Sequence, residues 1–138
     1  MNMKDERQFV GYSKYRSRLV DGHVHTELCP HGSGDRTAMM IEKAIELRIE
    51  KVCLTEHAPL PIAFAAEYGG DKKAYDTASL KLNEVDTYLE LGRQLQRAYG
   101  THIDISLGFE VDYIPGFESD IQEFLDRYGP LTDDNILS

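Results

Sequence analysis

Three of the five histidines in this 138-residue chain fall in one short stretch, DGHVHTELCPHGSGD, which spans residues 21–35. His23 and His25 are separated by one residue, and His31 follows six positions after His25. Imidazole suits zinc and iron as a ligand, and carboxylate oxygens also suit manganese. An HxH pair is a weak signal when it stands alone, because nearby histidines at a strand end often have no chemical role. The stretch therefore suggests a metal site that needs ligands from elsewhere in the chain.

Further candidate ligands come much later, each directly after an apolar run. Glu56 and His57 follow KVCLT, and Glu110 follows IDISLGF. Taken alone, His57 is equally compatible with an ordinary half-buried histidine. A carboxylate at Glu110 would be costly in an apolar setting without a partner, although a surface location would remove that cost. The convergence of several ligand types after apolar runs is a stronger signal than any one of these residues.

The elements that must position these residues alternate between strands and helices. Proline and glycine interrupt residues 58–77, which are predicted as one long loop with no regular element. Asp35 and Ser79 are expected to cap the helices that follow them, and Gly100 to end the second helix. The expected strands are 18–25, 51–55, 103–109 and 136–137, and the expected helices are 36–49, 82–99 and 117–128. This order predicts an α/β fold with parallel strands, as a layer or a barrel.

Parallel pairing would bring the candidate ligands to one edge of the sheet. Side chains alternate along a strand, so His23 and His25 point to the same face. The active sites of parallel α/β barrels lie at the C-terminal ends of their strands, which is where these residues fall. His102 precedes its strand, so it is predicted at the opposite edge as a solvated histidine. The sequence therefore predicts one shared site at the carboxyl ends of three strands.

Composition narrows the classes of partner. The net charge is −9, with 24 acidic against 15 basic residues, which disfavours a nucleic-acid partner because such proteins neutralise phosphates with basic residues. No apolar run is long enough for a membrane span, and no secretory signal is visible at the N-terminus. Cys29 and Cys53 form no CxxC pair, and both are expected to be packing residues rather than a disulfide. A soluble, cytoplasmic protein without a membrane partner is expected.

Several motifs together resemble the PHP (polymerase and histidinol phosphatase) superfamily. They are His23-x-His25, His31, TEHAP at residues 55–59 and GFEVD at residues 108–112. The stretches CPHGSGD and TEHAPLP are most similar to its histidinol-phosphatase branch. The resemblance implies the N-terminal half of a distorted (β/α) barrel, since a complete eight-unit barrel takes about 250 residues. Residues 18–138 would then be a partial PHP domain, preceded by a flanking segment at residues 1–17.

The resemblance also implies a cluster of two or three metal ions, which would be zinc, iron or manganese. Carried over by motif, His23 and His25 would hold one ion, and Glu110 would bridge that ion to a second. His31 and His57 would help to hold a third. No catalytic residue is assigned apart from these ligands. Three acidic residues next to the ligands would orient them from a second layer, with an ordinary surface role as the alternative: Asp21, Glu56 and Asp112.

The reaction implied by the resemblance is hydrolysis of L-histidinol phosphate to histidinol and phosphate, late in histidine biosynthesis. Divalent ions suit this chemistry because they activate water and offset charge on the phosphoryl oxygens. Uncatalysed hydrolysis of phosphate monoesters is extremely slow, so such help is needed. Family members have further ligands and phosphate-gripping basic residues beyond the segment that matches here. The chain is therefore expected to be part of a longer enzyme and to be inactive alone.

Two other functions remain open at this stage. One is a polymerase-associated PHP domain with an exonuclease or a structural role. The other is a non-catalytic domain that a metal stabilises and that serves as an interaction module.

Overall fold

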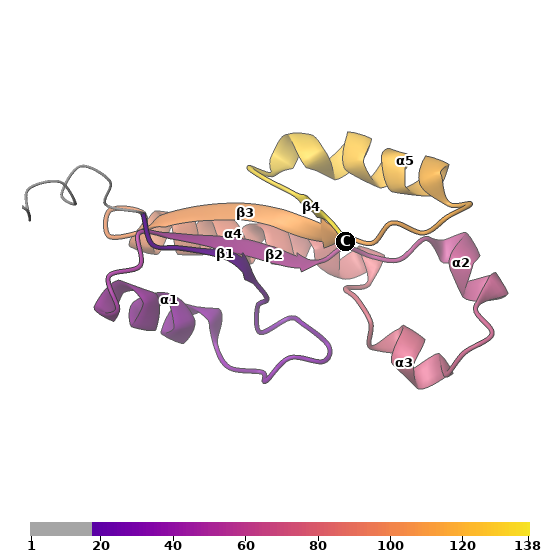
Figure 1. The fold of residues 1–138 in the computed structure, drawn as a ribbon, viewed down its shortest axis with the longest axis horizontal. Helices are drawn as coiled ribbons and strands as arrows, with labels where there is room; N and C mark the ends of the chain where they lie inside the picture. Colours follow the sequence, from indigo (N-terminus) through magenta and orange to yellow (C-terminus); the bar gives the residue numbers. More distant parts are fainter. Residues whose placement is uncertain (1–17) are drawn as a thin grey trace, which may run out of the picture.

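The structure is a computed structural model that describes residues 18–138, so the predicted flanking segment at residues 1–17 lies outside the described residues. Figure 1 shows the chain alternating between strands and helices. The strands are β1 (Val20–Val24), β2 (Lys51–His57), β3 (Asp104–Val111) and β4 (Ile136–Leu137). The α-helices are α1 (Thr37–Glu46), α2 (Ile62–Glu67), α3 (Lys72–Asp76), α4 (Val85–Tyr99) and α5 (Glu118–Tyr128). Two short 3₁₀ helices are η3 (Leu82–Glu84) and η4 (Gly129–Leu131).

The four strands form one parallel sheet in the order β1-β2-β3-β4. The β2–β3 ladder is uninterrupted and ends with His57 opposite Glu110. The β1–β2 ladder has an irregularity, because the pair Asp21–Val52 is followed by Val24–Leu54, which leaves one extra residue in β1. The predicted α/β fold with parallel strands is confirmed.

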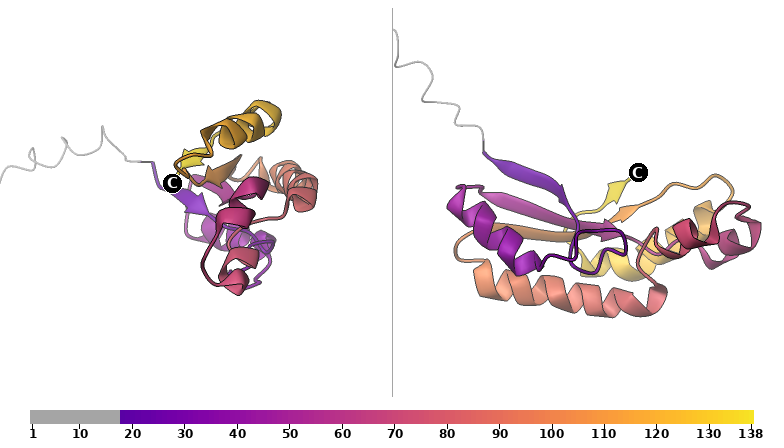
Figure 2. Two further views of the ribbon diagram at one scale, coloured as in Figure 1. Left: turned by 90° about the vertical axis from the view of Figure 1, so that its right-hand side faces the viewer. Right: turned by 90° about the horizontal axis from the view of Figure 1, so that it is seen from below.

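Helices α1, α4 and α5 lie on one side of a curled sheet, and α2 and α3 lie beyond the carboxyl end of β2. In the left-hand view of Figure 2, which looks nearly along the strands, α1, α4 and α5 surround the same face. Within residues 18–138 no helix covers the opposite face, so the architecture is that of half a (β/α) barrel. The hydrophobic core fills the space between the sheet and the helices. Its fully buried apolar residues include Ile41, Leu54, Tyr88, Leu107 and Phe109.

Helices α4 and α5 pack against β3 in different ways. At Gly92 of α4, a Cβ atom would overlap the end of the Leu107 side chain, so a larger residue there would require Leu107 to move. Helix α5 instead uses aromatic contacts, with Phe124 edge-on to Phe109 at a centroid distance of 5.1 Å. Such edge-to-face pairs are a favoured arrangement of aromatic rings. The two helices therefore hold the strand that ends in Glu110.

Polar side chains after η4 complete the free edge of β3 before β4 begins. The backbone N–H of Leu107 donates to Asp133 Oδ2 at 2.9 Å, and that of Phe109 donates to Asn135 Oδ1 at 2.9 Å. A Cβ atom on Gly108 would overlap the carbonyl oxygen of Asp134, so the crossing requires glycine. The predicted strand at residues 136–137 then pairs with β3 at Glu110 and Val111.

Several predicted boundaries were wrong. Strand β2 continues to His57, and β3 continues to Val111, so Glu56, His57 and Glu110 lie inside strands rather than after them. The predicted loop at residues 58–77 contains α2 and α3. Pro61 stands at the N-cap of α2, and Asp71 caps α3 by accepting from the backbone N–H of Lys73 at 2.9 Å. The proline and the polar residues here begin helices rather than exclude them.

Two predicted helix caps were also wrong. Arg36, not Asp35, occupies the N-cap of α1, and the Asp35 carboxylate accepts from Ser33. The Ser79 hydroxyl donates to the carbonyl of Leu80 and caps no described helix. The helical segment that was predicted to follow Ser79 begins instead with η3, whose N-cap residue is Lys81. Gly100 does end α4 as predicted. No described helix has the length and apolar character needed to cross a membrane.

Candidate metal centre

The candidate ligands converge at the carboxyl ends of three neighbouring strands. His23 lies in β1 and His25 directly follows it, while His57 is the last residue of β2. Glu110 lies opposite His57 in the parallel register. Register partners in a parallel ladder present their side chains to the same face. The sheet therefore places imidazole and carboxylate groups from β1, β2 and β3 side by side.

Four donor atoms surround one small volume. Glu110 Oε2 lies 2.9 Å from His23 Nε2, 3.4 Å from His25 Nε2 and 3.3 Å from His57 Nδ1. The Nε2 atoms of His23 and His25 are 3.1 Å apart. Ligand nitrogens on one tetrahedral zinc at about 2.0–2.1 Å lie about 3.3–3.4 Å from each other. Only small movements are needed for these atoms to share an ion, so His23, His25 and Glu110 form a group that could hold one.

A buried carboxylate fixes the orientation of His25. Glu56 Oε1 lies 3.0 Å from His25 Nδ1, and Glu56 is fully buried. Its other oxygen accepts from the backbone N–H of Thr26 at 2.8 Å and from the Thr26 hydroxyl at 2.7 Å. With Nδ1 committed to the carboxylate, His25 presents Nε2 to the cluster. This carboxylate–histidine pair is the usual arrangement behind a metal-binding histidine.

His31 approaches the cluster from the loop after β1. Its ring lies 4.9 Å from the ring of His57, measured between centroids, and His57 in turn stacks on His25 at 4.4 Å. His31 Nδ1 lies 2.8 Å from the carbonyl oxygen of Thr77, which can only accept. His31 Nδ1 therefore carries the proton and donates it to Thr77, which leaves Nε2 with a free lone pair.

Burial and charge set the protonation of the two central residues. Burial lowers the pKa of His57, and the nearby His25 and His31 lower it further, against the opposing charge of Glu110. Burial raises the pKa of Glu110, but hydrogen bonding, foremost with His23, outweighs it and leaves a net lowering. A neutral imidazole beside an ionised carboxylate is the state that binds metal ions. Among the described residues, the buried Nδ1 of His57 has no hydrogen-bond partner.

Cys29 lies closer to this cluster than the sequence indicated. It is buried, and its Sγ lies within 4.8 Å of a ring nitrogen of His25 and one of His57. Burial raises the pKa of its thiol. The two cysteines are free, as predicted. The spacing His25-x3-Cys29-x-His31 was the only signal of this proximity.

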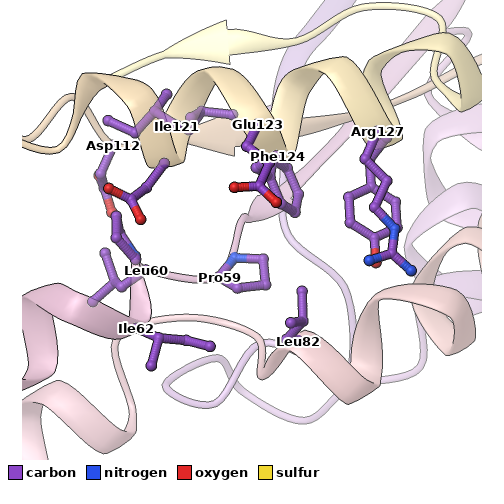
Figure 3. A pocket seen from close by; sticks show the side chains of 13 residues that line it. Pro59, Leu60, Ile62, Leu82, Asp112, Ile121, Glu123, Phe124 and Arg127 are labelled. Carbon is purple, nitrogen blue, oxygen red and sulfur yellow. The ribbon is translucent and has the colours of Figure 1, made fainter.

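Asp21 and Asp112, the other two acidic residues predicted to orient the candidate ligands, do not hydrogen-bond to one as Glu56 does within residues 18–138. The Asp21 side chain is exposed, and it makes no hydrogen bond or ion pair with residues 18–138. Asp112 is half-buried in the wall of a separate cavity of about 180 Å³, between α5 and the segment that follows β2. Figure 3 shows Asp112 and Arg127 at opposite ends of this cavity, with Pro59 and Phe124 between them.

Two residues that support the site escaped the sequence prediction. Thr26 anchors Glu56 with two hydrogen bonds, and the Tyr88 hydroxyl accepts from the backbone N–H of Glu56 at 3.3 Å. In the sequence, only the position of Thr26 directly after the HxH pair indicated that it supports the site. No sequence feature indicated a role for Tyr88, because its contacts depend on the tertiary packing of α4. His102 lies at the opposite end of the sheet and is exposed, as predicted.

Comparisons with known proteins agree with this architecture. The chain is 40% identical over 118 residues to the histidinol-phosphatase of Bacillus subtilis (strain 168). This alignment covers 86% of this chain and 42% of that protein. It is 26% identical over 110 residues to the "Probable histidinol-phosphatase" of Deinococcus radiodurans, covering 80% of this chain and 38% of that protein. The chain thus spans less than half the length of these curated relatives.

A solved structure shows the same fold. It is the crystal structure of the "putative histidinol phosphatase hisK" from Listeria monocytogenes, with a TM-score of 0.83 and 42% sequence identity. The match covers 86% of this chain and 43% of that one. The sequence profile of the PHP domain matches residues 21–135, a range that includes all of the candidate ligands. This chain belongs to the PHP domain family.

Proposed function

We propose that residues 18–138 supply part of the active site of a metal-dependent phosphomonoesterase. The substrate is L-histidinol phosphate, and the reaction is a cytoplasmic step of histidine biosynthesis. The observation that carries the proposal is the convergence of His23 Nε2, His25 Nε2 and His57 Nδ1 around one oxygen of Glu110. The two curated relatives, named as histidinol-phosphatases, support the choice of substrate.

The donor set fits the two or three ions that the family resemblance implies. His23 and His25 would hold the first ion, with Glu110 bridging it to a second. His31 and His57 would contribute to a third position, and their rings already lie 4.9 Å apart. Nitrogen and oxygen donors in this mixture suit zinc, iron or manganese. When bound, such ions supply the Lewis acidity that activates water and offsets charge on the phosphoryl oxygens.

The chain's own residues prepare these ligands for binding. Glu56 holds the proton of His25 on Nδ1, and the Thr77 carbonyl does the same for His31. His25 therefore directs its Nε2 towards the cluster without a change of tautomer, and the Nε2 of His31 is left free of the Thr77 contact. The lowered pKa of His57 keeps that ring neutral near pH 7. Ligands that are already oriented and neutral lose less free energy on binding an ion.

The decisive experiment uses a fusion, because the chain matches only 42% of the Bacillus subtilis enzyme. In the fusion, residues 1–138 replace the matching part of that enzyme, and phosphate release from L-histidinol phosphate is measured. We expect turnover by the fusion and its loss in the variants His23→Ala and Glu110→Gln. His102→Ala is the matched control, since that histidine is exposed at the opposite edge of the sheet. Full activity in the His23→Ala and Glu110→Gln fusions would contradict the proposal.

Further assays of the same fusion protein distinguish the two alternative functions. Release of nucleotides from a 3′ end of single-stranded DNA, without release of phosphate from L-histidinol phosphate, would favour the polymerase-associated class. Metal bound stoichiometrically with neither activity would favour a metal-stabilised interaction domain. The net charge of −9 argues against the first of these, because DNA is itself an anion.

A further inference from the structure

The hydroxyl of Tyr88 joins two strands directly behind the metal centre. Tyr88 lies on α4 and is completely buried. Its hydroxyl donates to the carbonyl oxygen of Gly108 on β3 at 2.6 Å and accepts from the backbone N–H of Glu56 on β2 at 3.3 Å. One oxygen atom therefore uses both its donor and its acceptor capacity on the backbones of neighbouring strands.

The two backbone groups belong to segments that position the cluster. Glu56 holds His25, and Gly108 precedes Glu110 by two residues on β3. The last register pair between β1 and β2 is Val24–Leu54, so Glu56 lies beyond the end of that ladder. On its other side, Glu56 is the register partner of Phe109, so the Tyr88 hydroxyl lies against the ladder that joins β2 to β3. Its ring packs against Phe109 at a centroid distance of 5.1 Å, which fixes the hydroxyl in place.

We propose that Tyr88 is a positioning residue for the metal centre. Its hydroxyl sets the place of Glu56 relative to Glu110, and through them the arrangement of His25 and the bridging carboxylate. The proposal rests on the metal site proposed above. It predicts that the Tyr88 hydroxyl changes metal affinity and ligand geometry, and not only the stability of the core. Groups that hydrogen-bond a ligand directly, as Glu56 does, typically contribute about 10–100-fold to metal affinity, and Tyr88 acts through Glu56, so we expect an effect at the lower end.

The test compares three variants of the 138-residue chain. Tyr88→Phe removes the hydroxyl and leaves the ring. Tyr99→Phe is the matched control on the same helix, because the Tyr99 hydroxyl donates to Glu42 Oε1 at 2.6 Å, away from the cluster. Leu95→Val lowers stability from a buried position on α4 without touching the hydroxyl. For each protein, Co²⁺ affinity is measured by competition with a chelator, and the visible spectrum of the bound Co²⁺ reports ligand geometry.

The proposal predicts about tenfold weaker Co²⁺ binding and an altered spectrum in Tyr88→Phe. Tyr99→Phe and Leu95→Val should keep the spectrum and affinity of the original chain. Unchanged binding in Tyr88→Phe, or an equal loss in Leu95→Val, would overturn the positioning role while leaving the metal site standing. Failure of the original chain to bind any of the proposed ions would instead count against the proposed function itself.

A second measurement applies if Tyr88→Phe does not fold. The original chain is labelled with 3-fluorotyrosine, and the ¹⁹F resonances are followed as Zn²⁺ is added. A positioning role predicts that the Tyr88 resonance shifts as the cluster fills, because coupling between two sites acts in both directions. The Tyr99 resonance should stay in place. A Tyr88 resonance that is unchanged at saturating Zn²⁺ would overturn the proposal.

Discussion

The Nδ1 atom of His25 lies 3.0 Å from Oε1 of Glu56, a carboxylate that is fully buried beneath the candidate metal centre. Burial raises the pKa of Glu56, but hydrogen bonds from Thr26 and His25 outweigh it and leave the pKa below its ordinary value. Glu56 is therefore ionised at neutral pH. The pair joins the end of β1 to the end of β2 and determines which nitrogen of His25 faces the cluster.

Replacing this carboxylate by an amide should weaken metal binding. In Glu56→Gln, the amide N–H groups would face either His25 or the two donors of Thr26. We expect metal affinity to fall about 10–100-fold and the free energy of unfolding to fall by about 1–3 kcal/mol. Calorimetric titration with Zn²⁺ and urea unfolding measure the two effects. Glu42→Gln is the control, because within residues 18–138 Glu42 accepts only from Tyr99, near the surface. Equal losses in both variants would contradict the role of Glu56.

Metal ions should stabilise the fold through Glu110. An ion that binds only the folded state at 100 times its Kd adds about 2.7 kcal/mol to the free energy of unfolding. We expect Zn²⁺ to raise the urea midpoint of the original chain, and EDTA to reverse the increase. In Glu110→Gln the increase should be much smaller, because the carboxylate shared by three histidines is lost. An equal increase in both proteins would show that Zn²⁺ binds elsewhere.

A methyl group at Gly108 should destabilise the fold, because the segment before β4 passes directly over this residue of β3. Gly108→Ala would place a Cβ atom on the carbonyl oxygen of Asp134. Overpacking of this kind typically costs about 1–3 kcal/mol, and we expect a value near the upper end because the neighbour is backbone. Gly22→Ala is the control, since a Cβ atom there would meet nothing within 4 Å. Urea unfolding of both variants measures the effect. Equal unfolding midpoints in Gly108→Ala and Gly22→Ala would contradict this prediction.

Asp133 should make the fold sensitive to acid. Burial raises its pKa, but hydrogen bonds from Leu107 and Gln96 and the charge of Arg93 produce a net lowering. The folded pKa therefore lies below the unfolded one. Its stabilisation is present above the unfolded pKa of about 3.9 and is lost as the pH falls through the folded pKa. The unfolding midpoint should fall less between pH 6 and pH 3 in Asp133→Asn than in the original chain, and equal falls would exclude this contribution.

Much of the sheet could be predicted, because its strands are marked by short apolar runs. The apolar runs that include Val24, Leu54 and Phe109 predicted the first three strands and their parallel order. The ends were predicted too early: Glu56 and Glu110 are polar residues that remain in strands because pairing with neighbours continues past the apolar run. Helices α2 and α3 were missed since each has only one or two turns and few apolar residues that pack inward.

The site could be predicted as a set of residues but not as a geometry. His23 and His25 were recognisable from spacing, and Glu110 from its position after an apolar run. The bond between His25 and Glu56 depends on how β1 and β2 are aligned, which spacing within one strand does not reveal. The proximity of Cys29 to His25 and His57 depends on the conformation of the loop after β1, and a packing role had been favoured for its thiol over metal binding.

The extra residue in β1 gives the candidate metal centre two walls of different regularity. His57 and Glu110 stand on an unbroken ladder, whereas His23 lies within the irregular pairing between Asp21 and Val24, and His25 follows it. A bulge bends its strand locally and increases its twist. The irregularity in β1 therefore affects the angle at which His23 and His25 face the regular pair on β2 and β3.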